Sequence, residues 1–196
     1  MQKKKIAFVV AIPDSAESFL VNHLESLTKT YDVSLIANFP EDYDASFFKG
    51  MKINFINAPI ERKISLKNDL KALAALYKIF KKNKFDSVHS VTPKAGLLTA
   101  MAAWLAGVKE RIHIYTGQVW ATRKGAMRMM LKMMDKMIAT LDNHILVDGE
   151  GQRQYLIKQG IVKAKNSSVL AHGSICGVKL EKFIISNSVR KNERDK

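Results

Sequence analysis

Seven short runs of apolar, mostly β-branched residues alternate along this chain with longer amphipathic stretches. Runs of this length are typical of buried strands, and the stretches between them are long enough to form helices. Such alternation is the pattern of parallel strands joined by crossover helices, and it predicts an α/β fold: a Rossmann-like three-layer domain with a mostly parallel sheet of about seven strands. The strands are expected at residues 6–12, 33–38, 53–58, 87–91, 111–116, 144–148 and 168–171.

The chain has 196 residues, 47% of them hydrophobic, which is enough for one sizeable core but short for two. We therefore expect one domain at residues 1–185, followed at 186–196 by the start of an interdomain linker or a disordered tail. Three lysines near the N-terminus lead directly into the first predicted strand, and no stretch of about 18 uncharged apolar residues occurs anywhere. These features predict a cytoplasmic protein without a signal peptide or a membrane-spanning helix.

The usual sequence signals for cofactors and metals are missing. The single cysteine, Cys176, has no Cys/His cluster around it, so we expect no metal site. Neither a Gly-x-Gly-x-x-Gly turn nor a Walker A loop occurs, and we expect no bound cofactor. No pair of carboxylates or Ser/His/Asp set stands out either, so the catalytic residues are left unassigned.

The net charge of +14 indicates an anionic partner: nucleic acid, a phosphorylated substrate or an acidic membrane surface. Residues 186–196 contain four basic and two acidic residues, so most of this charge belongs to the body of the chain. One expected surface helix, at residues 66–83, has a lysine-rich side opposite an apolar one. Its apolar side is predicted to carry Leu70, Leu73, Leu76, Tyr77 and Phe80.

A second basic helix is expected at residues 124–141, which hold six of the nine methionines. Its core-facing side is predicted from the three-four spacing of Met127, Met130, Met134, Met137, Ile138 and Leu141. Further apolar residues lie off that side, next to a basic ridge formed by Lys124, Arg128, Lys132 and Lys136. The surplus apolar surface and the ridge favour contact with an anionic membrane. Packing in the core, or against another subunit, is the alternative.

The segment Thr92-Pro93-Lys94 follows the fourth predicted strand and starts a helix. Thr92 suits the N-cap, and Pro93 suits the first helical position. A helix N-terminus at the carboxyl edge of a parallel sheet attracts anions, and Lys94 would add a full charge. A phosphate site is therefore one hypothesis for this segment, and a well-capped helix with a solvated Lys94 is the other.

Three segments of the sequence carry a family resemblance. The first runs from His89 through Gly96 to Val108 and on to His113, and the second covers 152–161, the expected helix after the sixth strand. The third, at 173–183, includes Gly173-Ser174-Ile175 and Gly177-Val178. These segments resemble the N-terminal domain of family 4 glycosyltransferases, and the third is similar to the segment that ends that domain. The matches occur in the family's order and cover most of the chain.

The resemblance implies the N-terminal half of a GT-B fold, in which two Rossmann-like domains face each other across a cleft. It further implies transfer of a sugar from a nucleotide sugar to a polyprenyl-diphosphate-linked acceptor in bacterial surface glycan synthesis. This domain would bind the acceptor, and a C-terminal domain absent from this chain would hold most of the nucleotide sugar. An anionic lipid acceptor accounts for both the charge and the methionine helix, and it places the protein peripherally on the inner face of the cytoplasmic membrane.

Two alternatives stay open: a basic α/β module that binds nucleic acid or an acidic partner, and one subunit of a split glycosyltransferase. The 124–141 helix lacks aromatic residues for stacking on bases, so nucleic acid is not the expected partner. By the resemblance, substrate contacts fall at strand ends and the loops after them. The candidates are His89, Thr92, Lys94, Thr116, Gly117, Gln118, Glu150, Gly173 and Ser174.

The chain departs from the family pattern at two strand ends. Many relatives carry two glycines after the first strand, where this chain has Ala11-Ile12-Pro13. Relatives also often have a His-Gly pair after the fifth strand, where this chain has Thr116-Gly117. A histidine role at that point therefore does not carry over.

Overall fold

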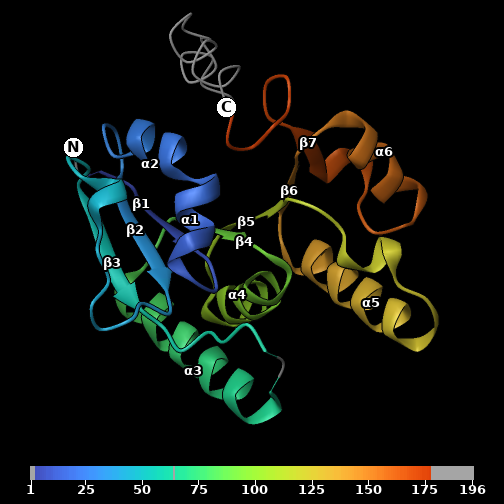
Figure 1. Ribbon diagram of the computed structural model, residues 1–196, viewed down its shortest axis with the longest axis horizontal. Helices are drawn as coiled ribbons and strands as arrows, with labels where there is room; N and C mark the ends of the chain where they lie inside the picture. The colour runs from blue at the N-terminus through green and yellow to red at the C-terminus, as the bar shows by residue number, and fades with distance from the viewer. Residues whose placement is uncertain (1–2, 64, 178–196) are drawn as a thin grey trace, which may run out of the picture.

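The computed structural model describes residues 3–63 and 65–177. Its centre is a seven-stranded sheet in the order β3-β2-β1-β4-β5-β6-β7, and every pairing is parallel (Figure 1). The predicted fold class is confirmed, and all seven expected strands are present with ends shifted by a few residues. Their bounds are β1 (Lys5–Val9), β2 (Asp32–Ala37), β3 (Ile53–Asn57), β4 (Ser87–Val91), β5 (Glu110–Tyr115), β6 (His144–Val147) and β7 (Ser167–Val169).

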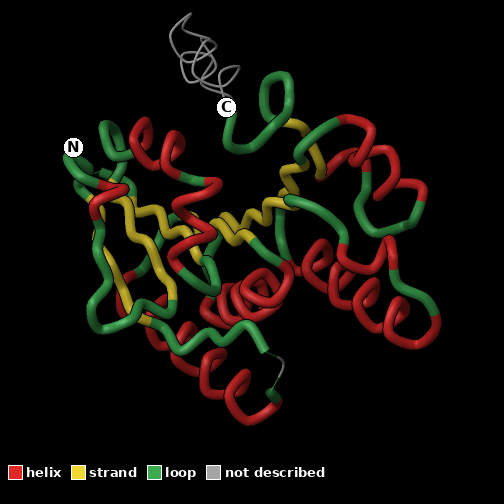
Figure 2. The backbone as a smooth tube through the Cα atoms, in the orientation of Figure 1, coloured by secondary structure: helices red, strands yellow, loops and turns green. Residues whose placement is uncertain are grey.

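Six α-helices and three short 3-10 helices connect these strands in the described residues (Figure 2). The α-helices are α1 (Pro13–Phe19), α2 (Val21–Leu27), α3 (Leu66–Asn83), α4 (Pro93–Ala106), α5 (Gly125–Leu141) and α6 (Glu150–Lys158). The 3-10 helices are η1 (Ser46–Phe48), η2 (Val119–Thr122) and η3 (Ala164–Asn166). No helix in the described part of the chain is sufficiently long and apolar to span a bilayer.

Successive residues of β1 point to opposite faces of the sheet and belong to two separate cores. Ala7 and Val9 pack with residues of α3 and α4, whereas Phe8, and Val10 directly after the strand, pack with residues of α1 and α2. A third core, around Trp120, joins η2, α5 and α6 to β5 and β6. The sheet is thus sandwiched between helices, as the three-layer prediction requires. The predicted domain boundary between 185 and 186 lies outside the described residues.

The orientation predicted for α5 is correct only in part. Of the predicted core side, Ile138 is buried and Met134 and Leu141 are half-buried, but Met127 and Met137 are 52% and 43% exposed. The other buried residues of the helix are Asp135 and Ala139. The cause is a polar anchor: the Trp120 indole N–H donates to Asp135 Oδ2 at 2.7 Å, and the Tyr115 hydroxyl donates to the Asp135 carbonyl at 2.8 Å. Two buried donors thereby fix which face of the helix turns inward.

This rotation also changes the predicted basic ridge of α5. Arg128 and Lys132 lie over the Trp120 ring, at 5.7 and 5.6 Å from its centroid. Lys132 Nζ also donates to Gln159 Oε1 at 2.9 Å. Lys124 and Lys136 are exposed. The four ridge residues therefore divide into two that pack against the domain and two that face solvent.

Candidate functional site

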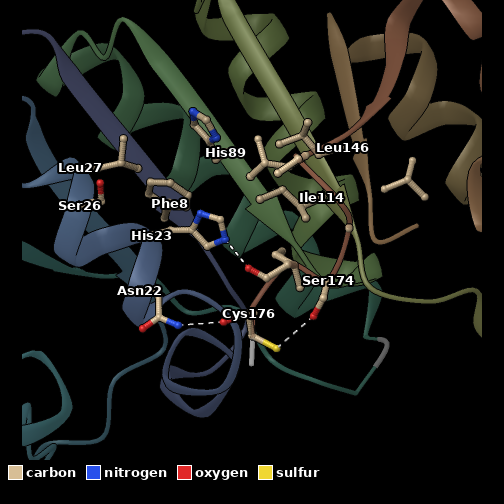
Figure 3. Close-up of a pocket in the computed structure, with 16 residues that line it drawn as sticks. Phe8, Asn22, His23, Ser26, Leu27, His89, Ile114, Leu146, Ser174 and Cys176 are labelled. Atoms are coloured by element: carbon tan, nitrogen blue, oxygen red, sulfur yellow. Dashed lines mark hydrogen bonds between the residues drawn. The ribbon is translucent and has the colours of Figure 1, made fainter. Parts of the chain in front are cut away.

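A largely apolar pocket of about 520 Å³ opens on the α1/α2 face of the sheet, over β1, β4, β5 and β6 (Figure 3). The sheet supplies Phe8, His89, Ile114, Leu146 and Val147. Helix α2 supplies Asn22, His23, Ser26 and Leu27, and the segment after β7 contributes residues between Leu170 and Gly177. Three of the predicted site residues line this pocket: His89, Gly173 and Ser174.

His89 lies on the floor of the pocket. Its ring stacks on Phe8 with centroids 4.7 Å apart, and Nε2 is 3.0 Å from the Ser87 hydroxyl (Figure 3). Burial, with a smaller effect from the nearby His23 ring, lowers the pKa of His89 to about 4. The imidazole is therefore neutral near pH 7 and offers a hydrogen bond rather than a charge. His89 was expected at a strand end, but it is the middle residue of β4.

The turn after β7 forms one wall of the pocket and is attached to the end of β6. The Ser174 N–H donates to the Asp148 carbonyl at 2.7 Å, and the Ile175 N–H donates to Asp148 Oδ1 at 2.5 Å. Gly173 has a φ of +95°, and a Cβ there would lie 2.7 Å from the Asp148 carbonyl oxygen. Glycine is thus required at this position for both conformation and space.

Helix α2 closes the pocket from the other side (Figure 3). Asn22 Nδ2 donates to the Cys176 carbonyl at 2.8 Å, and the His23 ring Nε2 bonds the Ile175 carbonyl. These contacts join residues more than 150 positions apart. No local pattern in the sequence points to Asn22, His23 or Asp148 as site residues, because their partners lie far away along the chain.

A chain of side-chain hydrogen bonds connects the carboxyl ends of β5 and β6. Gln152 Nε2 donates to Gln118 Oε1 at 3.2 Å, and the Asp148 N–H donates to Gln152 Oε1 at 3.0 Å. Gln118 Nε2 is buried and has no partner in the described protein. An unpartnered buried amide donor is unusual and suits an acceptor oxygen supplied from outside the domain. Thr116 and Gly117 lie in the same strand-end loop.

Glu150 is exposed in the first turn of α6 and does not line the pocket. It accepts hydrogen bonds from Gln154 at 2.6 Å and from Arg153 at 3.0 Å. These bonds, the one from Gln154 foremost, lower the pKa of Glu150. Its position at a helix N-terminus also favours a negative charge.

The segment at the start of α4 differs from its expected geometry. Thr92 occupies the predicted N-cap position and Pro93 begins the helix as predicted, but Thr92 has a φ of 75° and makes no side-chain cap bond. Its hydroxyl is buried without a partner in the described chain. Such a conformation is strained for a non-glycine residue, and strain of this kind concentrates at functional sites.

Lys94 forms its polar contacts within the domain. Its ammonium lies 2.6 Å from Asp69 Oδ1 and also bonds the Lys63 carbonyl. The side chain is only 14% exposed, so Lys94 is not a solvated surface charge. A phosphate at this helix start would have to compete with Asp69 for the ammonium. Within the described residues, no group of three or more His, Cys, Asp or Glu side chains is arranged to hold a metal.

The parallel sheet in this order, with helices on both faces and unpartnered polar groups at its carboxyl edge, defines a Rossmann-like domain of the type found in GT-B proteins. Residues 5–147 match the family model described as "Glycosyl transferase 4-like". Because this match covers more than half of the chain, the chain belongs to the family 4-like glycosyltransferases.

Two relatives and one solved structure illustrate the likeness. The chain is 33% identical over 130 residues to the capsular polysaccharide biosynthesis glycosyltransferase CapM of Staphylococcus aureus. The matched region covers 66% of this chain and 34% of CapM. It is 33% identical over 123 residues to the UDP-Gal:alpha-D-GlcNAc-diphosphoundecaprenol alpha-1,3-galactosyltransferase of Escherichia coli, covering 62% of this chain and 31% of that protein. This chain therefore spans about a third of the length of these relatives.

The structural likeness covers more of the chain. UDP-N-acetylglucosamine 2-epimerase from Rickettsia bellii superposes with a TM-score of 0.67 over 98% of this chain and 52% of that one. The sequence identity is 18%, so this comparison concerns the fold alone.

Proposed function

We propose that this chain is the acceptor-side domain of a glycosyltransferase that transfers a sugar from a nucleotide sugar to a polyprenyl-diphosphate-linked acceptor in bacterial surface polysaccharide synthesis. Membership of family 4 carries the proposal. The names of the two relatives, one for capsular polysaccharide and one for a diphosphoundecaprenol-linked sugar, supply the substrate class. Residues 1–185 would form this domain, and most donor contacts would come from a C-terminal domain, fused or separate.

The acceptor diphosphate would bind at the carboxyl edge of β4 and β5. The start of α4 contributes backbone N–H groups and a positive dipole end, and Thr92 contributes a buried hydroxyl without a partner. Gln118 contributes the free amide donor of Nε2. Donors aimed at the diphosphate would hold the acceptor in register with the sugar to be transferred. Lys94 takes part only where the phosphate replaces Asp69.

Kinetics of the two-domain enzyme test the role of Gln118. Gln118→Leu removes the free donor, and we expect it to raise the KM for the lipid-diphosphate acceptor about tenfold, with a smaller effect on the KM for the nucleotide sugar. Gln154→Leu, on the exposed side of α6, is the matched control and should leave both values unchanged. An effect confined to the donor KM would contradict the assignment.

The proposal also places the protein on the cytoplasmic face of the membrane, with α5 in contact with anionic lipid. Five methionines of α5 are exposed: Met127, Met129, Met130, Met133 and Met137. Exposed Lys124 and Lys136 lie beside them, whereas Arg128 and Lys132 pack on Trp120. The contact would therefore rest on the methionines and these two lysines.

Vesicle sedimentation separates this membrane contact from folding. Met129→Gln with Met133→Gln removes exposed apolar surface, and we expect binding to acidic vesicles to fall severalfold with no change in thermal stability. The control is Lys158→Gln with Gly151→Gln, at two exposed positions of α6. Tyr155 of the same helix is avoided because it packs against the core around Trp120. Equal binding by the methionine variant and the wild type would rule out α5.

A further inference from the structure

Helix α3 exposes an apolar strip of its own. Leu66 and Leu70 are 83% and 61% exposed, and the Tyr77 ring is exposed on the same side. With about 3.6 residues per turn, these three positions lie within roughly 40° of one another around the helix axis. Leu70 and Tyr77 were predicted to share one apolar side with Leu76 and Phe80, but only Leu76 and Phe80 are buried, so the predicted side is divided.

Lysines border this strip, and none of them forms an ion pair within the described residues. Glu61, before the helix, contacts α3 through a hydrogen bond from Asn68. Five exposed lysines follow it along α3: Lys67, Lys71, Lys78, Lys81 and Lys82. Lys81 Nζ lies 5.9 Å from the centroid of the Tyr77 ring. The single acidic residue of α3, Asp69, is paired with Lys94 of α4. The solvent face of α3 thus combines exposed apolar side chains with positive charge from its lysines.

Exposed apolar side chains gather on one layer of the domain. Of the fourteen large hydrophobic residues exposed in the described chain, ten lie on α3, α4 and α5, and none on α1, α2 or α6. Helix α4, which contacts both neighbours, contributes Trp104 and Leu105 near its C-terminal end. Isolated exposed hydrophobic residues are ordinary, but their concentration on three neighbouring helices is typical of an interaction surface.

We propose that the helix layer α3–α4–α5 is a bilayer-docking face, in which the lysines of α3 bind anionic headgroups and Leu66 and Leu70 enter the interface. Charge complementarity selects the occupant, because lysines combined with inserted leucines and an aromatic ring suit an acidic lipid surface. A groove for a peptide helix would need a concave apolar lining, which the convex side of a helix does not provide. The inference rests on the proposed function, since a lipid-linked acceptor requires the domain to reach the membrane.

Docking through two helices fixes the orientation of the domain. Helices α3 and α5 lie on the same side of the sheet, with α4 between them (Figure 1). A single amphipathic helix would leave the domain free to rotate about its axis on the surface. Contact through α3 as well would turn the α1/α2 face, with its pocket, away from the bilayer.

The test measures sedimentation of the 196-residue chain with vesicles of phosphatidylcholine and phosphatidylglycerol. Lys67→Gln, Lys71→Gln and Lys78→Gln are combined in one variant, and we expect vesicle affinity to fall at least tenfold, because each lysine near an acidic surface contributes roughly a fivefold factor. The matched control combines Lys49→Gln, Lys52→Gln and Lys165→Gln, three exposed lysines outside the layer. This control should retain affinity to within about twofold.

A second variant, Leu66→Ser with Leu70→Ser, should also weaken binding while keeping the salt dependence, because it removes insertion and leaves the charges in place. Brominated lipid should quench Trp104, which is exposed on α4, and Trp104→Phe should abolish that quenching. Buried Trp120 serves as the internal reference. Thermal melting of each variant checks the fold.

Each outcome separates the two proposals. Loss of binding in both the α3 variants and the α5 methionine variant supports this inference. Loss in the α3 variants alone would overturn docking through two helices. Loss in the α5 methionine variant alone would also overturn the inference, while leaving the α5 contact of the proposed function standing. Equal loss of vesicle binding in the triple lysine variant of α3 and in its control would show a response to net charge only, which also overturns the inference. Failure of the wild-type chain to sediment with acidic vesicles would overturn it as well.

Discussion

At the scale of single residues, the glycine at position 96, in the first turn of α4, is explained by one neighbouring side chain. A Cβ at this point of α4 would lie 2.4 Å from Cε1 of His113 and 3.2 Å from Ile138. The His113 ring cannot easily move, because it is buried, bonds the Ser90 hydroxyl at 2.8 Å and packs edge-on against Tyr115. Overpacking of a close-packed core outweighs the helix propensity that alanine would add.

We therefore expect Gly96→Ala to lower the free energy of unfolding by about 1–3 kcal/mol in urea denaturation. Gly151→Ala is the matched control, since Gly151 lies in α6 without a positive φ, and a methyl group added there would meet no atom within 4 Å. This control should raise the free energy of unfolding by up to about 1 kcal/mol. Equal stability of Gly96→Ala and wild type would show that His113 has room to shift.

Asp142 gives the molecule a specific pH dependence. Burial raises the pKa of this carboxyl to about 7, against an opposing effect of the Arg111 guanidinium, and Oδ2 has no partner in the described chain. The folded state therefore holds the proton more tightly than the unfolded state does. Stability contributed by this group is largest at low pH and is lost as the pH rises from about 4 to about 7.

Asp142→Asn removes this titration. We expect the variant's stability advantage over wild type to grow with pH by at most about 1.4 kcal/mol per unit, up to about pH 7, and then to level off. Urea denaturation at about pH 5 and about pH 8 measures the difference. Asp135, whose burial raises its pKa to about 6, is present in both proteins and cancels in the comparison. A constant difference at both pH values would contradict the raised pKa.

At the scale of elements, the sequence predicted those features of the fold that depend on a local pattern of residues. All seven strands were located because apolar β-branched runs carry their own signal, as in Ser87–Val91. The inward face of α5 was predicted only in part, because Trp120, outside the helix, hydrogen-bonds Asp135 and turns that residue inward. His89, Gly173 and Ser174 were predicted as substrate contacts from the family resemblance, and they line the pocket. His23 and Asp148 contact the turn after β7 through long-range hydrogen bonds that periodicity does not encode.

The same anchor makes η2 and α5 one structural unit, and Trp120 variants test this. Trp120→Ala should cost about 3–5 kcal/mol of unfolding free energy, because it opens a cavity beside Tyr155 and leaves Asp135 without its donor. Trp120→Phe keeps a ring against Tyr155 but loses the hydrogen bond, so its cost should be smaller. If the phenylalanine variant were as stable as wild type, the bond to Asp135 would not be what fixes the helix face.

At the scale of the whole molecule, we expect this chain to fold alone but not to catalyse alone. The described residues close a sheet with helices on both faces and three apolar cores, so thermal unfolding should be cooperative. Sugar transfer should not occur, because the carboxyl edge of the sheet offers hydrogen-bond donors on one side of the site only. Nothing in the described residues excludes water from the opposite side. A glycosyl donor bound there would be exposed to solvent.

Incubation of the 196-residue chain with a panel of nucleotide sugars and a polyprenyl-diphosphate sugar should therefore give no transfer above background. Calorimetry should show at most weak binding of the nucleotide sugar, because most donor contacts are assigned to the other domain. Addition of a donor domain from a full-length relative, fused or as a separate chain, should restore transfer, and rescue by the separate chain would favour a split enzyme. Sustained turnover by this chain without that addition would contradict the assignment of donor binding to a second domain.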